Sequence, residues 1–301
     1  MNEKILKHHL TSSIYTNAGN YKDYFKNLPD NISELGNLIC SQIIHRVTLK
    51  EGNENANKGL LYGDMTKFPW YRMRCEDDIL LTAVSMTAEL FRLDDRGFTL
   101  DRQVENKIVV TCRYVSVLMS AILKAKGIPC RSRSGFAPYC KEGSSLDHWI
   151  NQYWDKKQSK WVTFDADFFS DDNLGFNQYD IPTDKFDWAA DTWLKIRENK
   201  VDGNKFIYAG GEQSLRAAIR AIFYDFHSLM NNEISYLFQP AYINGKFDKL
   251  LEDDFKEIDS LANLMIDPDK NFDQLYEVWN NNKKFRIMNS PLVGDWDNGL
   301  I

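Results

Sequence analysis

The stretch Thr111–Phe136, TCRYVSVLMSAILKAKGIPCRSRSGF, decides the fold that this sequence predicts. Apolar residues recur in its first half at the spacing of a buried helix face: Val115, Leu118, Met119, Ile122 and Leu123. Gly127 stands where a glycine commonly ends a helix, and Pro129 prevents the helix from continuing. Small and basic residues then favour a strand from Cys130 to Ala137. We therefore expect a helix that begins at Cys112 and is followed directly by a strand.

Two aromatic runs follow, one from His148 to Trp154 and one from Trp161 to Asp165, and the polar tract 155–160 joins them. Their composition predicts an antiparallel hairpin. A turn centred on residues 156 and 157 places His148 opposite Asp165. A turn centred one residue later places His148 opposite Asp167, with Asp165 as its diagonal neighbour. Both registers leave an aspartate beside the histidine, so the pairing pattern does not choose between the two carboxylates.

Helices are expected on both sides of this centre. After the cap Asp30-Asn31, one helix carries an apolar stripe of Leu35, Leu38, Ile39 and Ile43. A second is expected from about Glu76 to Arg92, with acidic residues in its first turn and a buried face of Ile79, Leu80, Ala83, Val84, Thr87 and Phe91. The tract 51–58 predicts a loop, and further helices are expected near 215–230, 255–266 and 273–281. Because no linker separates these parts, we predict a single α+β domain over 1–301. Its core covers about 75–190, with helical additions at 1–74 and 191–301.

The composition excludes several classes of function. The chain has 301 residues and a formal net charge of −6, which does not favour binding to phosphate backbones, so no nucleic-acid partner is expected. No signal peptide and no membrane-spanning run are evident. The five cysteines form no C-x-x-C motif, which fits reduced thiols better than a disulfide framework. We expect a soluble cytoplasmic protein.

Cys112 is the candidate nucleophile, because a helix N-terminus stabilises the reactive thiolate. The alternative is a small buried cysteine without chemistry, as most free cysteines are. A thiolate also needs a base, and His148 lies at the start of a strand behind a loop that contains Gly143. Asp165 ends the next strand and would orient the imidazole. The other histidines, His8, His9, His45 and His227, have no such context.

The run 111–136, the run DHWINQYWD (147–155) and the run WVTFDAD (161–167) together resemble the transglutaminase-like superfamily. The resemblance covers roughly residues 75 to 190. It implies a papain-like α+β core, in which an antiparallel sheet packs on the nucleophile helix. It also implies Cys112 as nucleophile, His148 as base and Asp165, rather than Asp167, as the orienting carboxylate.

Three positions depart from the superfamily pattern: Val110 where glycine is common, Ala166 where proline is common, and Arg113 directly after the cysteine. Arg113 could recognise an acidic group or be a solvated helix residue, and the second reading is favoured. Gln103 could contribute to an oxyanion hole, although a surface position is favoured for it as well.

The resemblance implies a thiol acyl-transfer enzyme that acts on amide or ester carbonyls through a thioester at Cys112. Its substrates would be peptides, proteins or small amides, with water or an amine as acceptor. A cysteine peptidase or amidase is the alternative reaction, and a non-catalytic peptide- or protein-binding module is the alternative of another class. No cofactor and no metal are expected, because Cys130, Cys140 and His148 lack a fourth zinc ligand at a familiar spacing.

Overall fold

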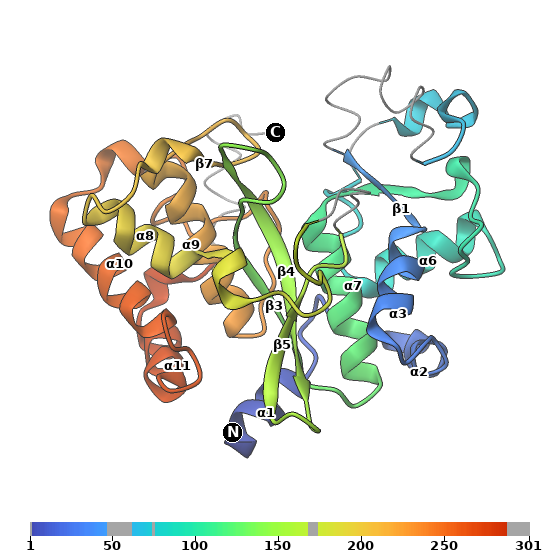
Figure 1. The fold of residues 1–301 in the computed structure, drawn as a ribbon, viewed down its shortest axis with the longest axis horizontal. Helices are drawn as coiled ribbons and strands as arrows, with labels where there is room; N and C mark the ends of the chain where they lie inside the picture. The colour runs from blue at the N-terminus through green and yellow to red at the C-terminus, as the bar shows by residue number, and fades with distance from the viewer. Residues whose placement is uncertain (1, 47–61, 74–75, 168–173, 288–301) are drawn as a thin grey trace. The chain divides into compact units, whose positions relative to one another are not determined.

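The computed structural model describes residues 2–46, 62–73, 76–167 and 174–287, so the loop expected at 51–58 lies outside the described residues. The chain divides into two compact units. Unit 1 comprises residues 1–132 and 149–183, and unit 2 comprises residues 133–148 and 184–301. Figure 1 shows the elements of both units. The single-domain reading of the sequence stays a prediction.

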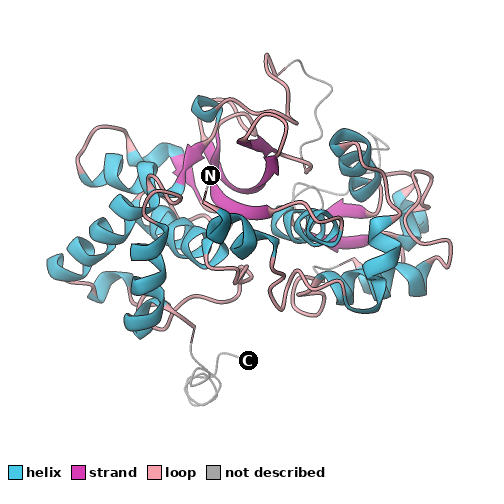
Figure 2. Ribbon diagram, turned by 90° about the horizontal axis from the view of Figure 1, so that it is seen from below, coloured by secondary structure: helices cyan, strands magenta, loops and turns pink. Residues whose placement is uncertain are grey.

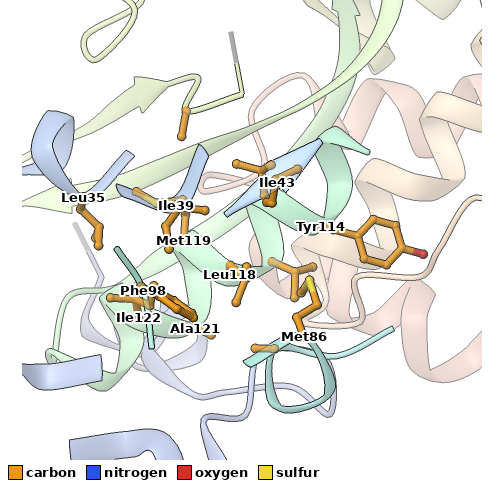
Figure 3. Close-up of a cluster of buried hydrophobic side chains, with 14 of the residues drawn as sticks. Leu35, Ile39, Ile43, Met86, Phe98, Tyr114, Leu118, Met119, Ala121 and Ile122 are labelled. Atoms are coloured by element: carbon orange, nitrogen blue, oxygen red, sulfur yellow. The ribbon is translucent and has the colours of Figure 1, made fainter. Parts of the chain in front are cut away.

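Unit 1 is built around helix α7, which begins at Cys112 as expected. Its described helices are α1 (Glu3–Leu10), α2 (Lys22–Lys26), α3 (Ile32–Cys40), α6 (Ala83–Leu93) and α7 (Cys112–Ala125). Asn31 caps α3, as predicted, by accepting hydrogen bonds from the N–H groups of Ser33 and Glu34. Gly127 has φ +81°, the left-handed conformation that follows many helix ends. The predicted apolar stripe of α7 is buried in the core cluster shown in Figure 3.

A curled five-stranded sheet provides the β part of the α+β fold, which confirms the predicted fold class. Its strands are β3 (Cys130–Ala137), β4 (Ser145–Asp155), β5 (Lys160–Phe164), β6 (Asp187–Trp188) and β7 (Phe206–Ile207). The order is β5-β4-β3-β6, and β7 pairs with β4. Figure 2 shows these strands in magenta. The boundary between the two units runs through β3 and β4.

Within unit 1, helix α7 packs against this sheet through hydrogen bonds between buried polar groups. Asn151 of β4 donates to the carbonyl of Ser116 and to the hydroxyl of Ser120. The Ser116 hydroxyl donates to Ser132 of β3 at 2.8 Å. These bonds satisfy polar groups that would be costly to bury alone, and they fix the register of the helix on the sheet.

The hairpin of β4 and β5 adopts the second of the two registers left open by the sequence. Its ladder runs from Asn151 opposite Phe164 to Asp155 opposite Lys160. The turn is therefore centred one residue later than on 156 and 157. The ladder ends before it reaches His148, so strand pairing gives Asp165 no advantage over Asp167.

A second, two-stranded parallel sheet joins β1 (Ile43–His45) to β2 (Ile108–Val110). Ile43 faces Ile108, and His45 faces Val110. Ile43 thus belongs to a strand rather than to the apolar stripe of the preceding helix. Because α7 begins directly after β2 and Thr111, this pairing brings His45 to the N-terminus of α7.

The helix expected from Glu76 begins later, at Ala83, which corrects that prediction. Glu76 instead binds β2: its N–H donates to the carbonyl of Val109, and its carboxylate accepts from the N–H of Val109. Thr82 and Ser85 form a capping box that starts the helix at the next residue. Ile79, predicted to be buried, is 67% exposed because it precedes the helix.

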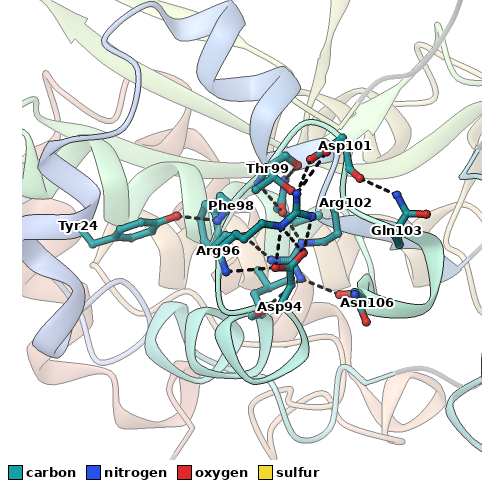
Figure 4. Close-up of polar contacts among 12 residues, drawn as sticks. Tyr24, Asp94, Arg96, Phe98, Thr99, Asp101, Arg102, Gln103 and Asn106 are labelled. Atoms are coloured by element: carbon teal, nitrogen blue, oxygen red, sulfur yellow. Dashed lines mark hydrogen bonds and ion pairs between the residues drawn. The ribbon is translucent and has the colours of Figure 1, made fainter.

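The segment that leads into β2 is fixed by a buried arginine (Figure 4). Arg102 donates to the side chain of Gln42 and to the carbonyls of Leu90, Gly97 and Asn106. Burial lowers the pKa of Arg102. One guanidinium thus joins the end of α3, helix α6 and the approach to β2.

Unit 2 contains the helices α8 (Ala189–Arg197), α9 (Leu215–Leu229), α10 (Glu252–Met265) and α11 (Phe272–Asn281). The last three confirm the helices predicted for this part of the chain, with small shifts at their ends. A buried ion pair joins Arg133 of β3 to Asp225 of α9 through two hydrogen bonds of 2.7 and 2.8 Å. None of the described helices combines the length and the hydropathy needed to cross a lipid bilayer.

Candidate active site around Cys112

Cys112 is the first residue of α7 and is 3% exposed. Thr111 stands at the N-cap position, but its side chain makes no capping hydrogen bond. The N–H of Cys112 donates instead to Nε2 of His45 at 3.2 Å. The sequence prediction of a cysteine at the positive end of a helix is therefore confirmed, and a histidine lies beside it.

His45 is a site residue that the sequence interpretation missed. It ends β1, and its Nε2 lies 3.3 Å from Oδ2 of Asp167. The side chain of His45 is 21% exposed, whereas that of Asp167 is only 2% exposed. The sequence signal for the position of His45 was a pair of short apolar runs, Ile43-Ile44 and Ile108-Val110, which can pair as strands. Parallel pairing between such distant runs leaves no local pattern in a sequence.

Asp165 and Asp167 follow β5 and are both buried. Oδ1 of Asp165 accepts a hydrogen bond from the N–H of Asp167 at 2.9 Å. The Asp165 N–H donates to the carbonyl of Gln178. The thiol of Cys40, the last residue of α3, donates to the carbonyl of Ala166, which lies between the two aspartates. The turn that carries both carboxylates is thus held by α3.

Cys40 is a second buried thiol close to the same carboxylates, but its electrostatic setting differs from that of Cys112. Burial raises the pKa of the Cys40 thiol well above its usual value, and the charges of Asp167 and Asp165 raise it further. Cys40 also lies at the C-terminal, negative end of its helix. Cys40 is therefore held as a protonated thiol.

His148 lies in unit 2, at the fourth position of β4 rather than at its start. The strand begins earlier because Ser145 and Leu146 pair with Phe206 and Ile207 of β7, a long-range pairing that the sequence pattern could not reveal. His148 is 7% exposed, and its ring meets that of Tyr139 edge to face, with centroids 6.3 Å apart. The triad of Cys112, His148 and Asp165 stays a prediction.

The described geometry of His45 differs from that of a catalytic triad. In a triad, one imidazole nitrogen faces the nucleophile and the other faces the carboxylate. Here the same atom, Nε2 of His45, is directed at both Cys112 and Asp167. His45 and Asp167 therefore do not form a proton relay to Cys112 in this arrangement.

Among the described residues, one group of three has potential metal-ligating atoms close together. These atoms of His45, Cys112 and Asp167 all lie within 4.8 Å of one another. The set considered from the sequence, Cys130, Cys140 and His148, does not form such a group in the described part of the chain.

The structure also tests the two surface positions that were favoured for Arg113 and Gln103. Arg113 is fully buried, which overturns the interpretation of a solvated residue. It donates to the carbonyl of Leu81, and its guanidinium lies over the rings of Tyr15 and Tyr114. Gln103 is exposed and donates to the carbonyl of Asp101, so its predicted surface position is confirmed.

Comparison with known proteins adds to this geometry. One solved structure, provisionally named a cysteine protease and from Cytophaga hutchinsonii, has a TM-score of 0.34 and 14% sequence identity to the chain. The similarity covers 64% of this chain and only half of that protein's length, so it carries no argument about activity. No protein of curated function matches the chain.

A family model gives the stronger result. Residues 102–166 match the model of the transglutaminase-like superfamily. The matched segment includes Cys112, the whole of α7, His148 and Asp165. The resemblance to the transglutaminase-like superfamily that the sequence motifs predicted is therefore confirmed for residues 102–166.

Proposed function

We propose that the chain is a cysteine-dependent acyl-transfer enzyme in which Cys112 attacks an amide or ester carbonyl. His148 is the base that holds the thiol proton and returns it to the leaving group, and Asp165 orients the imidazole. The thioester at Cys112 is then released by water or by an amine. The substrates of this reaction are peptides, proteins or small amides.

The position of Cys112 at the first residue of α7, inside the superfamily match, carries this proposal. At that position the helix dipole favours thiolate. The backbone N–H of the same residue points out of the helix N-terminus, where it can stabilise a tetrahedral oxyanion. In the described structure, His45 accepts that N–H, so a substrate oxyanion would have to displace its imidazole.

The proposed role of Asp165 rests on the superfamily motif, in which a strand ends at the catalytic carboxylate. Asp165 directly follows β5 and is 1% exposed, so a negative charge there acts in a medium of low dielectric constant. Its bond to the Asp167 N–H fixes the orientation of the carboxylate.

Two alternatives use the same residues. Hydrolysis would make the protein a peptidase or amidase, and the acceptor that enters the site decides between hydrolysis and transfer. A binding module would keep the fold and use the same residues only to hold a peptide. The binding module requires no reactive thiol, so the reactivity of Cys112 separates it from both enzymes.

The test is mass spectrometry of the intact full chain after incubation with a library of peptides and small amides, with and without added amines. We expect an acyl adduct that maps to Cys112, is lost in Cys112→Ala and is retained in the matched control Cys140→Ala. Faster release by amines than by water would indicate transfer rather than hydrolysis. An adduct that persists in Cys112→Ala would contradict the assignment of the nucleophile.

A further inference from the structure

We infer that His45, Cys112 and Asp167 form a zinc site whose occupation withdraws the thiolate from reaction. The inhibitory effect rests on the proposed function of Cys112, whereas the metal site itself does not. The sequence predicted no metal site, because its ligands come from β1, the start of α7 and the turn after β5. Their convergence depends on the parallel pairing of β1 with β2.

The direction of Nε2 is the first argument. Because this atom accepts the backbone N–H of Cys112, its lone pair faces the first residue of α7, and an ion that takes the lone pair replaces this hydrogen bond. The same lone pair is the group that a neutral histidine offers to a metal. Oδ2 of Asp167 approaches this nitrogen at 3.3 Å, a separation close to that of two zinc ligands, which is roughly 3.3 to 3.8 Å.

The distances among the three ligands are the second argument. Their potential ligating atoms lie within 4.8 Å of one another, so shifts of roughly an ångström bring them to bonding distances of about 2.0 to 2.3 Å from one ion. One nitrogen, one sulfur and one oxygen suit zinc, whereas calcium and magnesium prefer oxygen ligands alone.

Charge and access are the third argument. A thiolate and a carboxylate carry two negative charges, which a divalent cation neutralises in a site where Cys112 and Asp167 are buried. The side chain of His45, at 21% exposure, provides the open side through which an ion enters. Three protein ligands leave a fourth position for water.

The binding step releases one proton and involves no redox change. The zinc–sulfur bond forms with the Cys112 thiolate, and the proton that the thiol has given up passes to solvent. A chelator that removes the ion allows the thiol to take up a proton again. Zinc therefore acts as a reversible block on the nucleophile.

The experiment uses the full chain with Zn²⁺ or Co²⁺. We expect one Zn²⁺ per chain by competition with a chromophoric chelator, and a sulfur-to-cobalt charge-transfer absorption with Co²⁺. His45→Gln and Asp167→Asn should each weaken zinc binding by about 10- to 100-fold or more. Cys140→Ser, the matched thiol control, should retain the affinity.

A second measurement links the metal to the nucleophile. Zn²⁺ should slow the alkylation of Cys112 in the unmodified chain, and His45→Gln should remove this protection relative to its own zinc-free rate. Zinc binding that persists in both ligand variants, or absence of the charge-transfer absorption, would overturn the inference. If the absorption appears while Cys112 is unreactive without metal, the proposed function fails and the metal site stands.

Discussion

Two sets of buried side chains, one in each unit, differ in how their polar groups are paired by hydrogen bonds. In unit 2, Arg133 and Asp225 form a bidentate ion pair, and the Ser134 N–H donates to the same carboxylate. The guanidinium of Arg133 also lies over the ring of Trp188. In unit 1, one nitrogen of His45 serves both Cys112 and Asp167.

The difference indicates which set stabilises the fold and which is available for chemistry. Two parallel hydrogen bonds pair the guanidinium of Arg133 with the carboxylate of Asp225, and this pairing compensates both buried charges. In unit 1, by contrast, a nitrogen, a sulfur and an oxygen atom lie close together. Such an arrangement can bind a metal ion or a reacting carbonyl group. Substitutions in the first set should therefore change stability, and substitutions in the second set should change reactivity.

The largest expected effect belongs to Asp165. Asp165→Asn should preserve the fold, because the amide oxygen can still accept the Asp167 N–H. Turnover should fall by up to about 10⁴-fold, because an amide neither stabilises imidazolium nor selects the same tautomer. Asp167→Asn should lower turnover far less, because the superfamily motif, and not the hairpin register, assigns the orienting role to Asp165; it should lower zinc affinity more.

Both variants are compared by their rates on the substrate identified by adduct mapping, or by Cys112 alkylation rates if no substrate is found. Full activity of Asp165→Asn together with collapse of Asp167→Asn would show that the wrong carboxylate was assigned.

The next effect concerns the stability that the ion pair of Arg133 and Asp225 contributes. Asp225→Ala should lower the free energy of unfolding by about 3 to 5 kcal/mol, because it leaves the charge of Arg133 buried and unmatched. The control is Asp191→Ala, which breaks the exposed pair with Lys195 and should cost at most about 1 kcal/mol. Urea unfolding followed by tryptophan fluorescence measures both. Equal losses in the two variants would contradict the structural role of the buried pair.

A smaller effect, dependent on pH, is expected from His227 in unit 2. Burial lowers the pKa of this histidine to about 4. Between its unfolded value near 6.5 and that value, the unfolded chain binds more protons than the folded one. His227 therefore makes the free energy of unfolding fall as the pH falls through this range.

His227→Asn removes this titration. From pH 7 to pH 4.5, the unmodified chain should lose about 2 kcal/mol more stability than the variant does. Urea unfolding at the two pH values gives the difference, which is independent of any constant loss caused by the substitution. The same pH dependence in both proteins would show that His227 does not contribute.

Local patterns predicted the elements that depend on neighbouring residues, such as α7 with its apolar stripe and Gly127, the cap at Asn31 and the hairpin of β4 and β5. Long-range pairing decided the rest. Glu76 binds Val109 instead of starting a helix. Pairing with β7 makes β4 begin before His148, and pairing of β1 with β2 brings His45 to Cys112. The hairpin register was left open because a shift of the turn by one residue leaves an aspartate near His148 in both cases.

The relative reactivity of Cys112 and Cys40 tests the central claim most directly, because both thiols are buried near Asp167, Cys112 at the N-terminus of one helix and Cys40 at the C-terminus of another. The full chain is treated with iodoacetamide at about pH 6, and the cysteines are followed by peptide mapping over time. We expect Cys112 to be alkylated first, at least about 100-fold faster than Cys40, since the thiolate is the reactive form. Modification of Cys40 or Cys140 while Cys112 stays inert in the folded protein would contradict the account.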